Sequence, residues 1–428
     1  MREDLPTPGR PGWAGAGAGA GDATLEPPGL GSLPGLADPL VKIGDLAASA
    51  GIRSVDVVAW RDLHHPEAGG SELHAARIAE RWAGAGIDVA ITTSSFEGGA
   101  GHGVVEGCRV TRPAGRYGIF PRVAAGRLLD RYVRSHLPAG SRRGPGPADA
   151  TVEIWNGMPF FSPLWAARPR AVFLHHIHDA MWDLVLPSGL AALGRFIESS
   201  VAPPVYRGTP IVTLSSSSRQ AILDHLRFRP EQVHVVEPGV DDMYQPGPQR
   251  SPRPLVVAVG RLVPYKRFDR LIEVLVELRR RHPDLEAVIA GEGQERGALE
   301  QLVSRHGAQD WLTLPGRISD EALVDLYQRA WVLASTSAYE GWGLTITEAA
   351  ACATPAVVSP ISGHRDAVAD GITGFLAEPG PAMTDRIDAL LADHPLRRRM
   401  QRAARLRAET LTWDRAALDT MRVLADQA

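Results

Sequence analysis

The stretch of sequence that decides the fold lies at residues 339–348 and reads Tyr-Glu-Gly-Trp-Gly-Leu-Thr-Ile-Thr-Glu. It follows an apolar run at Trp331–Ala334, and its two glycines keep the chain in loop geometry until a helix begins near Leu344. Two carboxylates, Glu340 and Glu348, therefore flank the start of a helix. Ionised carboxylates accept hydrogen bonds from hydroxyl groups, whereas the N–H groups at an open helix N-terminus bind phosphate. The stretch predicts a ligand that carries both kinds of group.

A second turn, at residues 260–266, reads Gly-Arg-Leu-Val-Pro-Tyr-Lys and connects an apolar run at Leu255–Val259 to a helical pattern at Asp269–Arg281. The glycine permits a tight turn, and the cations Arg261 and Lys266 would add their charge to that of the helix dipole. We expect this turn to bind a diphosphate. The alternative is a solvated loop with unspecialised cations.

Short apolar runs alternate with longer helical patterns in both halves of the chain, which predicts two doubly wound α/β domains. In the first half we expect strands at Val55–Trp60, Ile87–Thr93, Val152–Trp155, Ala171–His175, Ile211–Leu214 and Val233–Val236, and helices at Ser71–Ala85 and Phe120–His136. In the second half we expect strands at Leu255–Val259, Glu286–Ala290, Trp311–Leu314, Trp331–Ala334 and Ala356–Val358, and helices at Asp269–Arg281 and Asp320–Arg329. Ligands of open α/β sheets bind beyond the carboxyl ends of the strands, so a substrate would lie in a cleft between the domains.

Composition sets the expected domain boundaries. A Pro-, Gly- and Ala-rich extension covers residues 1–50; it buries too little apolar surface to offset its ordering entropy, so we expect it to be disordered. The first domain then covers residues 51–237, a linker rich in proline and glycine covers 238–254, and the second domain covers 255–395. Arg-rich helices fill residues 396–428.

In the first half, residues 64–72 read His-His-Pro-Glu-Ala-Gly-Gly-Ser-Glu and lead into a helix. Gly69 and Gly70 allow the backbone to approach a ligand closely. The alternative is a plain turn in which Ser71 or Glu72 starts the helix.

Net charge and cysteine content exclude several classes of protein. A formal charge of -3 lacks the basic footprint of a nucleic-acid binder. Cys108 and Cys352 are the only cysteines, which argues against a disulfide framework. No apolar run reaches the roughly 18 residues that a membrane span needs, and residues 1–50 lack the apolar stretch of a signal peptide. We therefore expect a cytoplasmic protein.

Taken together, these motifs resemble those of retaining glycosyltransferases with the GT-B fold, in the large sugar-nucleotide-dependent family (group 1, or family four) that carries a Glu, seven residues, Glu motif. The resemblance runs from about Val55 to Trp413 and includes Ala-Gly-Glu-Gly at 290–293, Pro-Gly-Arg at 315–317 and Gly-Ile-Thr-Gly-Phe at 371–375. It implies an α/β protein of two Rossmann-like domains that face each other across a cleft. The acceptor would lie on the first domain and the nucleotide sugar on the second.

The resemblance also implies roles for individual residues. The expected catalytic residues are Arg261, Lys266, Glu340 and His175, with His175 facing the donor sugar. Donor-binding residues would be Gly70, Gly260, Arg261, Lys266, Ile318, Glu340, Gly343, Leu344, Thr345 and Glu348. In this set Arg261 and Lys266 bind the diphosphate, Glu340 contacts the transferred sugar and Glu348 holds the ribose. The backbone near Ile318 would contact the base, and the helix around Trp413 would cross back onto the first domain.

Simple packing is the alternative role for His175 and for His178. A zinc site built from His175, His176 and His178 is a further alternative, but alternation along a strand sends the first two to opposite faces. The Asp-any-Asp motif of metal-dependent glycosyltransferases does not occur. We therefore expect neither a metal nor another cofactor beside the nucleotide sugar, which would be of the UDP or GDP type.

The expected reaction moves a hexose-type sugar from a nucleoside diphosphate sugar to an acceptor hydroxyl, with retention of anomeric configuration and without a metal ion. The rivals are a sugar-nucleotide epimerase on the same fold, a phosphorylase, for whose pyridoxal phosphate lysine we see no context, and a non-catalytic protein that binds nucleotide sugars. The acceptor, a glycan, lipid or small molecule, stays open.

The helix at Phe120–His136 carries arginines at 122, 127, 131 and 134 and could rest on the inner face of a membrane; an exposed amphipathic helix face is the alternative. Three positions depart from the family pattern: Ala353, Asp366 and Glu237 stand where Gly, Glu and Asn are common. We expect Asp366 to lie near the donor.

Overall fold

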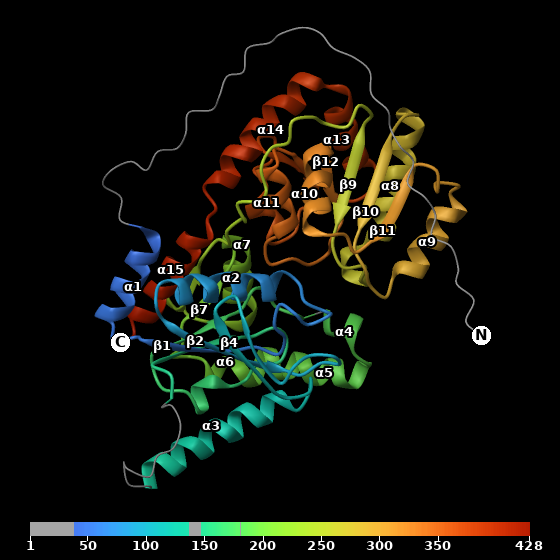
Figure 1. The fold of residues 1–428 in the computed structure, drawn as a ribbon. Coiled ribbons are helices and arrows are strands. Elements are labelled where there is room, and N and C mark those ends of the chain that lie inside the picture. Colours follow the sequence, from blue (N-terminus) through green and yellow to red (C-terminus); the bar gives the residue numbers. More distant parts are fainter. Residues whose placement is uncertain (1–37, 137–146, 180) are drawn as a thin grey trace, which may run out of the picture. The chain divides into compact units, whose positions relative to one another are not determined.

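The computed structural model describes residues 38–136, 147–179 and 181–428; residues 1–37 of the expected extension lie outside this part of the chain. The strand order of the first sheet is β3-β4-β2-β1-β5-β6-β7-β8 (Figure 1). Paired neighbours are parallel except β3 and β4, which are antiparallel. The strands are β1 (Ser54–Val58), β2 (Asp88–Ser94), β3 (His102–Val105), β4 (Cys108–Ala114), β5 (Ala150–Ile154), β6 (Arg170–Phe173), β7 (Ile211–Thr213) and β8 (Val233–Val235).

The second sheet is parallel throughout, with the order β11-β10-β9-β12-β13-β14. Its strands are β9 (Leu255–Val259), β10 (Glu286–Ala290), β11 (Leu312–Gly316), β12 (Val332–Ser335), β13 (Ala356–Val358) and β14 (Gly374–Leu376). The described residues 236–254, between the two sheets, form neither helix nor strand.

Helices flank both sheets. Those of the first half are α1 (Pro39–Ser49), α2 (Gly70–Gly84), α3 (Ile119–His136), α4 (Met181–Val185), α5 (Ser188–Phe196), a π-helical turn at Ile197–Val201, α6 (Ala202–Val205) and α7 (Ser216–Leu226). Those of the second half are α8 (Phe268–Arg281), α9 (Arg296–Arg305), α10 (Asp320–Arg329), α11 (Leu344–Ala351), α12 (His364–Ala367), α13 (Pro381–Ala392), α14 (His394–Glu409) and α15 (Trp413–Ala425). Within the described ranges, none of these helices combines the length and the hydropathy that crossing a membrane requires.

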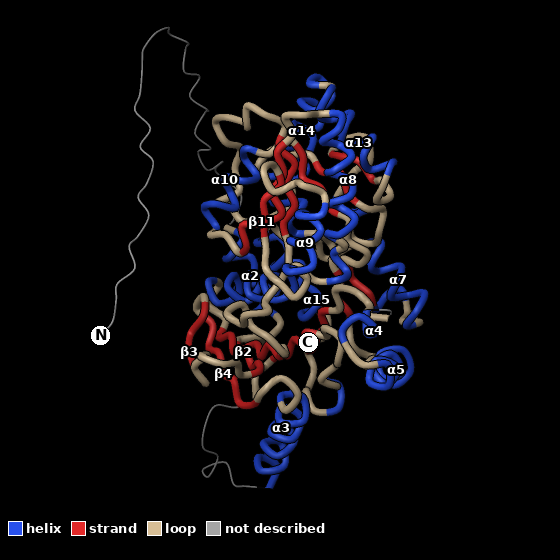
Figure 2. The backbone as a smooth tube through the Cα atoms, turned by 90° about the vertical axis from the view of Figure 1, so that its right-hand side faces the viewer, coloured by secondary structure: helices blue, strands red, loops and turns tan. Residues whose placement is uncertain are grey.

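Helices that cover both faces of a parallel sheet explain its nearly continuous apolar strands. β5 is buried along its whole length, and β9 at all but its last residue. Figure 2 shows α8 and α9 beside the second sheet. The buried stripe of α8 follows the helical period, with Phe268, Leu271, Ile272, Leu275 and Leu278 facing the sheet core.

The sequence analysis missed a β-hairpin in the first domain. β3 and β4 are joined by Glu106 and Gly107, whose φ angles of 49° and 76° suit a tight two-residue hairpin turn. Because a non-glycine residue occupies the first of these positions, the pair did not signal a turn.

The expectation of a disordered segment reaching residue 50 was wrong for its last part. Helix α1 forms there, and its Ile43 and Ala47 are buried in the core of the first domain. Figure 1 shows α1 (blue) beside α15 (red), from the other end of the chain. Trp82 Nε1 of α2 donates to the Ala417 carbonyl of α15 at 3.0 Å. The sequence around α1 did not predict this helix, because α15, which packs against its apolar face, lies at the other end of the chain.

Candidate functional site

The centre of the candidate site is an ion pair between the two turns that the sequence singled out. Lys266 ends a short 3₁₀ turn after β9, and Glu340 lies in the loop between β12 and α11. The Lys266 ammonium pairs with the Glu340 carboxylate, which also accepts a hydrogen bond from Ser337 Oγ at 3.0 Å. Burial disfavours both charges, but their mutual attraction outweighs it, so the pKa of Glu340 is lowered and that of Lys266 is raised. Both side chains are charged at neutral pH.

Two glycines shape the loop that leads into α11. Gly343 caps the helix with a φ of 102°, in the left-handed region that favours glycine. A Cβ on Gly341 would lie 2.6 Å from the carbonyl oxygen of His175, so the loop packs directly against the first domain. The N–H groups of Leu344 and Thr345 lie in the first turn of α11, where the helix itself supplies no acceptor.

Glu348 lies further along α11 and is only 8 % exposed. Burial is the main reason why the pKa of Glu348 rises to about 7, and the charges of Asp241 and Asp320 add to the shift. Tyr327 donates a hydrogen bond from its hydroxyl to Glu348 Oε2 at 3.0 Å, which limits the shift. Ile318, expected beside the base, packs at the edge of the apolar cluster that contains Tyr327.

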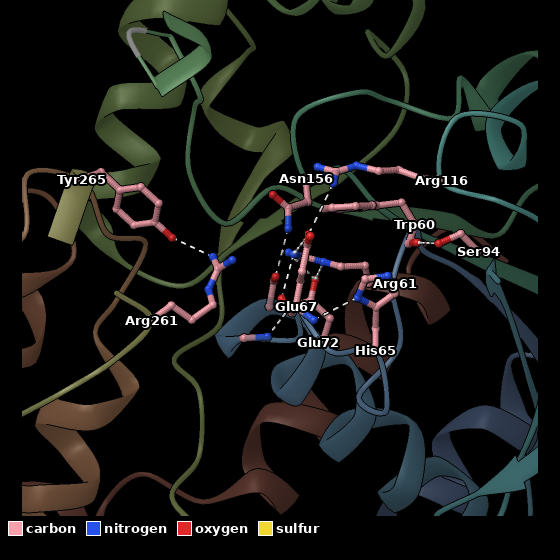
Figure 3. A network of polar contacts seen from close by, with 12 residues as sticks. Trp60, Arg61, His65, Glu67, Glu72, Ser94, Arg116, Asn156, Arg261 and Tyr265 are labelled. Atoms are coloured by element: carbon pink, nitrogen blue, oxygen red, sulfur yellow. Dashed lines mark hydrogen bonds and ion pairs between the residues drawn. The ribbon is translucent and has the colours of Figure 1, made fainter. Parts of the chain in front are cut away.

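Arg261 lies next to the first domain (Figure 3). Its guanidinium donates to the Tyr265 hydroxyl at 2.7 Å, and a Cβ on Gly69 would lie 3.6 Å from Arg261 Nε. A Cβ on the neighbouring Gly70 would come within 3.2 Å of Leu344 Cδ1. The paired glycines therefore approach both Arg261 and the first turn of α11.

Buried polar contacts hold the turn before α2 (Figure 3). Arg61 is 5 % exposed and donates through Nε to Glu72 Oε1 at 3.1 Å. Glu72 Oε2 also accepts from the Gly69 N–H at 2.7 Å, so the side chain of the third helical residue satisfies the backbone of the N-cap residue. Asn156 Nδ2 donates to Ser71 Oγ at 3.0 Å, which ties the turn to the segment after β5.

The histidines after β6 have different surroundings. His175 is buried, with Nε2 lying 3.1 Å from Nδ1 of His74 in α2, and burial lowers the pKa of both rings. Burial also lowers the pKa of His176, but the charges of Glu340 and Lys266 act on this ring as well. His175 is thus packed inside the first domain, whereas the Lys266–Glu340 pair acts electrostatically on His176. The catalytic role of His175 stays a prediction.

Most of the predicted residues gather around the Lys266–Glu340 pair, including Gly260, whose Cβ would lie 3.6 Å from Lys266 Nζ. Three side chains that the motifs did not single out contact these residues: Ser337, Tyr265 and Tyr327. Tyr265 and Ser337 are close in sequence to the residues they contact, whereas Tyr327 lies on another helix. The described residues hold no group of three or more His, Cys, Asp or Glu able to bind a metal ion.

Comparison with known families accounts for this arrangement. The family model described as "Glycosyl transferases group 1" matches residues 241–407, and the one described as "Glycosyltransferase Family 4" matches residues 68–243. Between them they cover the turns at Gly70, Lys266 and Glu340. The chain belongs to the group 1 glycosyltransferases. The family predicted from the motifs is confirmed.

Among curated group 1 relatives, alpha-D-kanosaminyltransferase of Streptomyces kanamyceticus is 36% identical over 35% of this chain and 39% of its own length. D-inositol 3-phosphate glycosyltransferase of Kribbella flavida is 35% identical over 45% of this chain and 50% of its own length. The chain thus spans about half or less of these two relatives. A protein of the latter name from Streptomyces scabiei is 28% identical over 84% of this chain and 88% of its own length.

Solved structures agree on the fold. Sucrose-phosphate synthase from Thermosynechococcus elongatus superposes with a TM-score of 0.71 at 19% identity, covering 86% of this chain and 98% of its own. Anabaena Alr3699/HepE, in complex with UDP and glucose, gives a TM-score of 0.66 at 19% identity, covering 87% and 100%. At such identities the likeness concerns the fold alone, and the GT-B prediction of two Rossmann-like domains is confirmed.

Proposed function

We propose that this group 1 glycosyltransferase moves a hexose-type sugar from a UDP- or GDP-type nucleotide sugar to an acceptor hydroxyl, with retention and without a metal ion. The main support is the Lys266–Glu340 pair next to the first turn of α11. A carboxylate, two cations and helix N–H groups suit the hydroxyl and phosphate groups of one donor. The transferase names of the curated relatives, and the UDP and glucose bound to the Anabaena protein, add support.

The chemistry follows from where charge develops. Breaking the bond between the anomeric carbon and the phosphate builds negative charge on the leaving diphosphate. Arg261, Lys266 and the N-terminus of α11 would stabilise that charge, because they are in place before the reaction begins. Glu340, kept ionised by Lys266, would accept hydrogen bonds from the sugar, and Glu348 from the ribose. These fixed positive groups would do the work that a divalent cation does in metal-dependent transfer.

For retention we propose attack on the same face of the sugar. The acceptor oxygen bonds to the anomeric carbon as the bond to the diphosphate breaks, and the leaving phosphate takes the proton of the acceptor hydroxyl. Trapping of a covalent glycosyl-enzyme adduct would contradict this route.

For the acceptor side, we propose peripheral contact with a membrane through α3, in line with a cytoplasmic protein that meets a lipid or glycan acceptor there. Leu128, Leu129 and Tyr132 are between 47% and 63% exposed on this helix, which supports the idea. Sedimentation with anionic vesicles should carry the protein down, and replacing both leucines with Ser should leave it in solution. Equal sedimentation of the two proteins would contradict the proposal.

The lysines allow a direct test of the donor site. The chain has only two, Lys42 and Lys266, and Lys42 is exposed on α1. UDP or GDP should protect Lys266 from an amine-reactive label and leave Lys42 fully labelled. Calorimetry with UDP against GDP then identifies the base, and a labelled donor screened against acceptors identifies the transfer. Unchanged labelling together with no calorimetric binding would refute the donor site.

The same assays separate the rival functions. Conversion of the donor sugar without an acceptor would indicate an epimerase. Nucleotide binding with neither conversion nor transfer across the acceptor screen would favour the binding protein.

A further inference from the structure

A buried carboxylate outside the site described above holds the loop that carries the histidines. Glu198 lies in the π-helical turn Ile197–Val201 and is 1 % exposed. It accepts three hydrogen bonds: from the N–H groups of His178 at 2.9 Å and Asp179 at 3.1 Å, in the loop after β6, and from Trp182 Nε1 of α4 at 3.0 Å. Such π-helical turns occur frequently at functional sites.

Burying the Glu198 carboxylate costs desolvation free energy, which indicates that this residue has a specific role. Burial raises the pKa of Glu198, and the three donors counteract that rise. Among the described residues, its ion-pair contact is with His178 Nδ1 at 3.9 Å, and burial lowers the pKa of that ring well below its ordinary value, so the ring carries no charge. A buried carboxylate without a cation is tolerated only where hydrogen bonds satisfy it fully.

The loop that Glu198 holds is strained and closely packed. Asp179 has a φ of 33°, which costs free energy for a residue other than glycine. Trp182 packs so tightly that a Cβ on Gly194 of α5 would lie 2.8 Å from its ring, and one on Gly157 would lie 3.1 Å away. Figure 1 shows α4, which carries Trp182, beside α5. Without its anchor this loop would relax away from the observed geometry.

The other side of the loop faces the two turns, at residues 260–266 and 339–348, that would bind the donor. The ring of His176 stacks on that of His178 with centroids 4.8 Å apart, and the charges of Glu340 and Lys266 act on His176. The carbonyl oxygen of His175 touches Gly341, and α4 contacts the 3₁₀ turn that ends at Lys266. A shift of the loop would therefore move its contacts with both turns of the site.

We infer that Glu198 is a positioning residue, whose carboxylate fixes the loop at residues 175–179 and, with it, the His176 ring and the contacts of this loop with the turns that would hold the donor sugar. The inference rests on the proposed function for its effect on transfer. The geometry it describes does not depend on that function.

The chain contains a matched control. Glu153 of β5 is equally buried and also accepts three hydrogen bonds: from the N–H of Phe160 at 2.6 Å, from the N–H of Ser162 at 3.0 Å and from the Tyr206 hydroxyl at 2.6 Å. Burial raises the pKa of Glu153 as well. Glu153 thus has the chemistry of Glu198 but orders a different loop.

The first arm of the test compares Glu198→Gln with Glu153→Gln. An amide cannot accept all three hydrogen bonds, so both variants should lose stability. Only Glu198→Gln should lower kcat/KM for transfer, by roughly tenfold or more, because small displacements of positioning groups are costly. Glu198→Asp should recover part of that loss. The double variant Glu198→Gln/His176→Ala should be no slower than His176→Ala alone.

The second arm needs no activity. NMR titration of the His176 ring, assigned by its loss in His176→Gln, should give a pKa closer to the ordinary value in Glu198→Gln, and the wild-type pKa in Glu153→Gln. If neither transfer nor the His176 titration differs between the two glutamine variants, the inference is refuted. If the wild-type protein binds no nucleotide while the His176 titration responds as expected, the proposed function fails and the positioning role stands.

Discussion

At the scale of single residues, the pKa values of Glu340 and Glu348 are shifted in opposite directions. Glu340 is paired with Lys266 and stays ionised, so the proposed donor would have to compete with an existing ion pair: its phosphate for Lys266 and its hydroxyls for Glu340. Glu348 is buried beside the Tyr327 hydroxyl, and its pKa rises to about 7. Their different tertiary neighbours, rather than their own sequence context, cause this difference.

Replacing Lys266 tests the ion pair directly. Lys266→Ala should lower kcat/KM by roughly a hundredfold, about 3 kcal/mol, because it removes a cation aimed at the leaving diphosphate. Steady-state kinetics with a labelled donor measure the loss. Lys42→Ala, the only other lysine change available, should have no effect. Near-wild-type turnover of a folded Lys266→Ala protein would contradict the role.

The raised pKa of Glu348 predicts opposite pH dependences for the free energy of unfolding and for nucleotide affinity. The pKa of about 7 in the folded state exceeds the ordinary value of 4.5, so the folded state holds the proton more tightly, and the free energy of unfolding should fall as pH rises between these values. Ribose hydroxyls prefer the ionised carboxylate, so nucleotide affinity should rise over the same range. Urea unfolding measures the first trend and calorimetry with nucleotide the second, both at pH values between 5 and 8 that are spaced by ~1 unit.

Glu348→Gln serves as the control for both trends. Gln does not titrate, so this variant should lose the contribution of Glu348 to each pH dependence. A variant that keeps both wild-type slopes would show that other groups cause them.

At the scale of elements, helix α12 and the loop before α11 meet the start of helix α7. Asp366 accepts hydrogen bonds from the N–H groups of Ser216 at 3.0 Å and Ser217 at 3.2 Å, and from the Ser217 hydroxyl. Ser218 Oγ donates to the Gly341 carbonyl at 3.2 Å. We expected Asp366 near the donor on family pattern alone; the structure pairs it with α7, where a carboxylate suits the helix dipole.

Removing the Asp366 carboxylate should therefore weaken this junction. Asp366→Ala leaves two N–H groups of α7 without their acceptor and should lower the free energy of unfolding by about 1 kcal/mol. Chemical denaturation measures the change. Ser216 contributes through its backbone, so Ser216→Ala is the matched control and should have little effect. Equal stability of the two variants would argue against the junction.

At the scale of the whole described chain, the last helix returns to the first domain. Trp413 is 3 % exposed in the core of that domain, with its ring centroid 6.0 Å from that of His74. A Cβ on Gly239 would lie 2.2 Å from Trp413 N, so the linker and α15 touch. Arg77 of α2 pairs with Asp241 of the linker at 2.9 Å. These contacts connect both ends of the second domain to the first.

Truncating Trp413 tests that connection. Trp413→Ala should lower the free energy of unfolding by about 3–5 kcal/mol, because a buried aromatic side chain leaves a cavity. Leu406→Ala, on α14 and 64 % exposed, should change it by less than about 0.5 kcal/mol. Urea denaturation of both variants decides the matter. A small loss in Trp413→Ala would mean that α15 is not needed for the stability of the first domain.

The sequence by itself determined the strands of both sheets other than β3, β4 and β14, some of the flanking helices, and the turns at 260–266 and 339–348, because buried parallel strands, helical periodicity and glycine-containing turns are local patterns. The same patterns did not predict α1, because its apolar face is buried against α15. They also did not predict the hairpin at Glu106, because a non-glycine residue takes the left-handed conformation there.

Only the tertiary structure decided the state of Glu348, the partner of Asp366, the different surroundings of His175 and His176, and the anchoring role inferred for Glu198. Each depends on burial or on a partner many residues away in the chain. The physical reason is that a side chain's protonation and orientation follow from the dielectric and the donors around it, and packing rather than sequence neighbours supplies these.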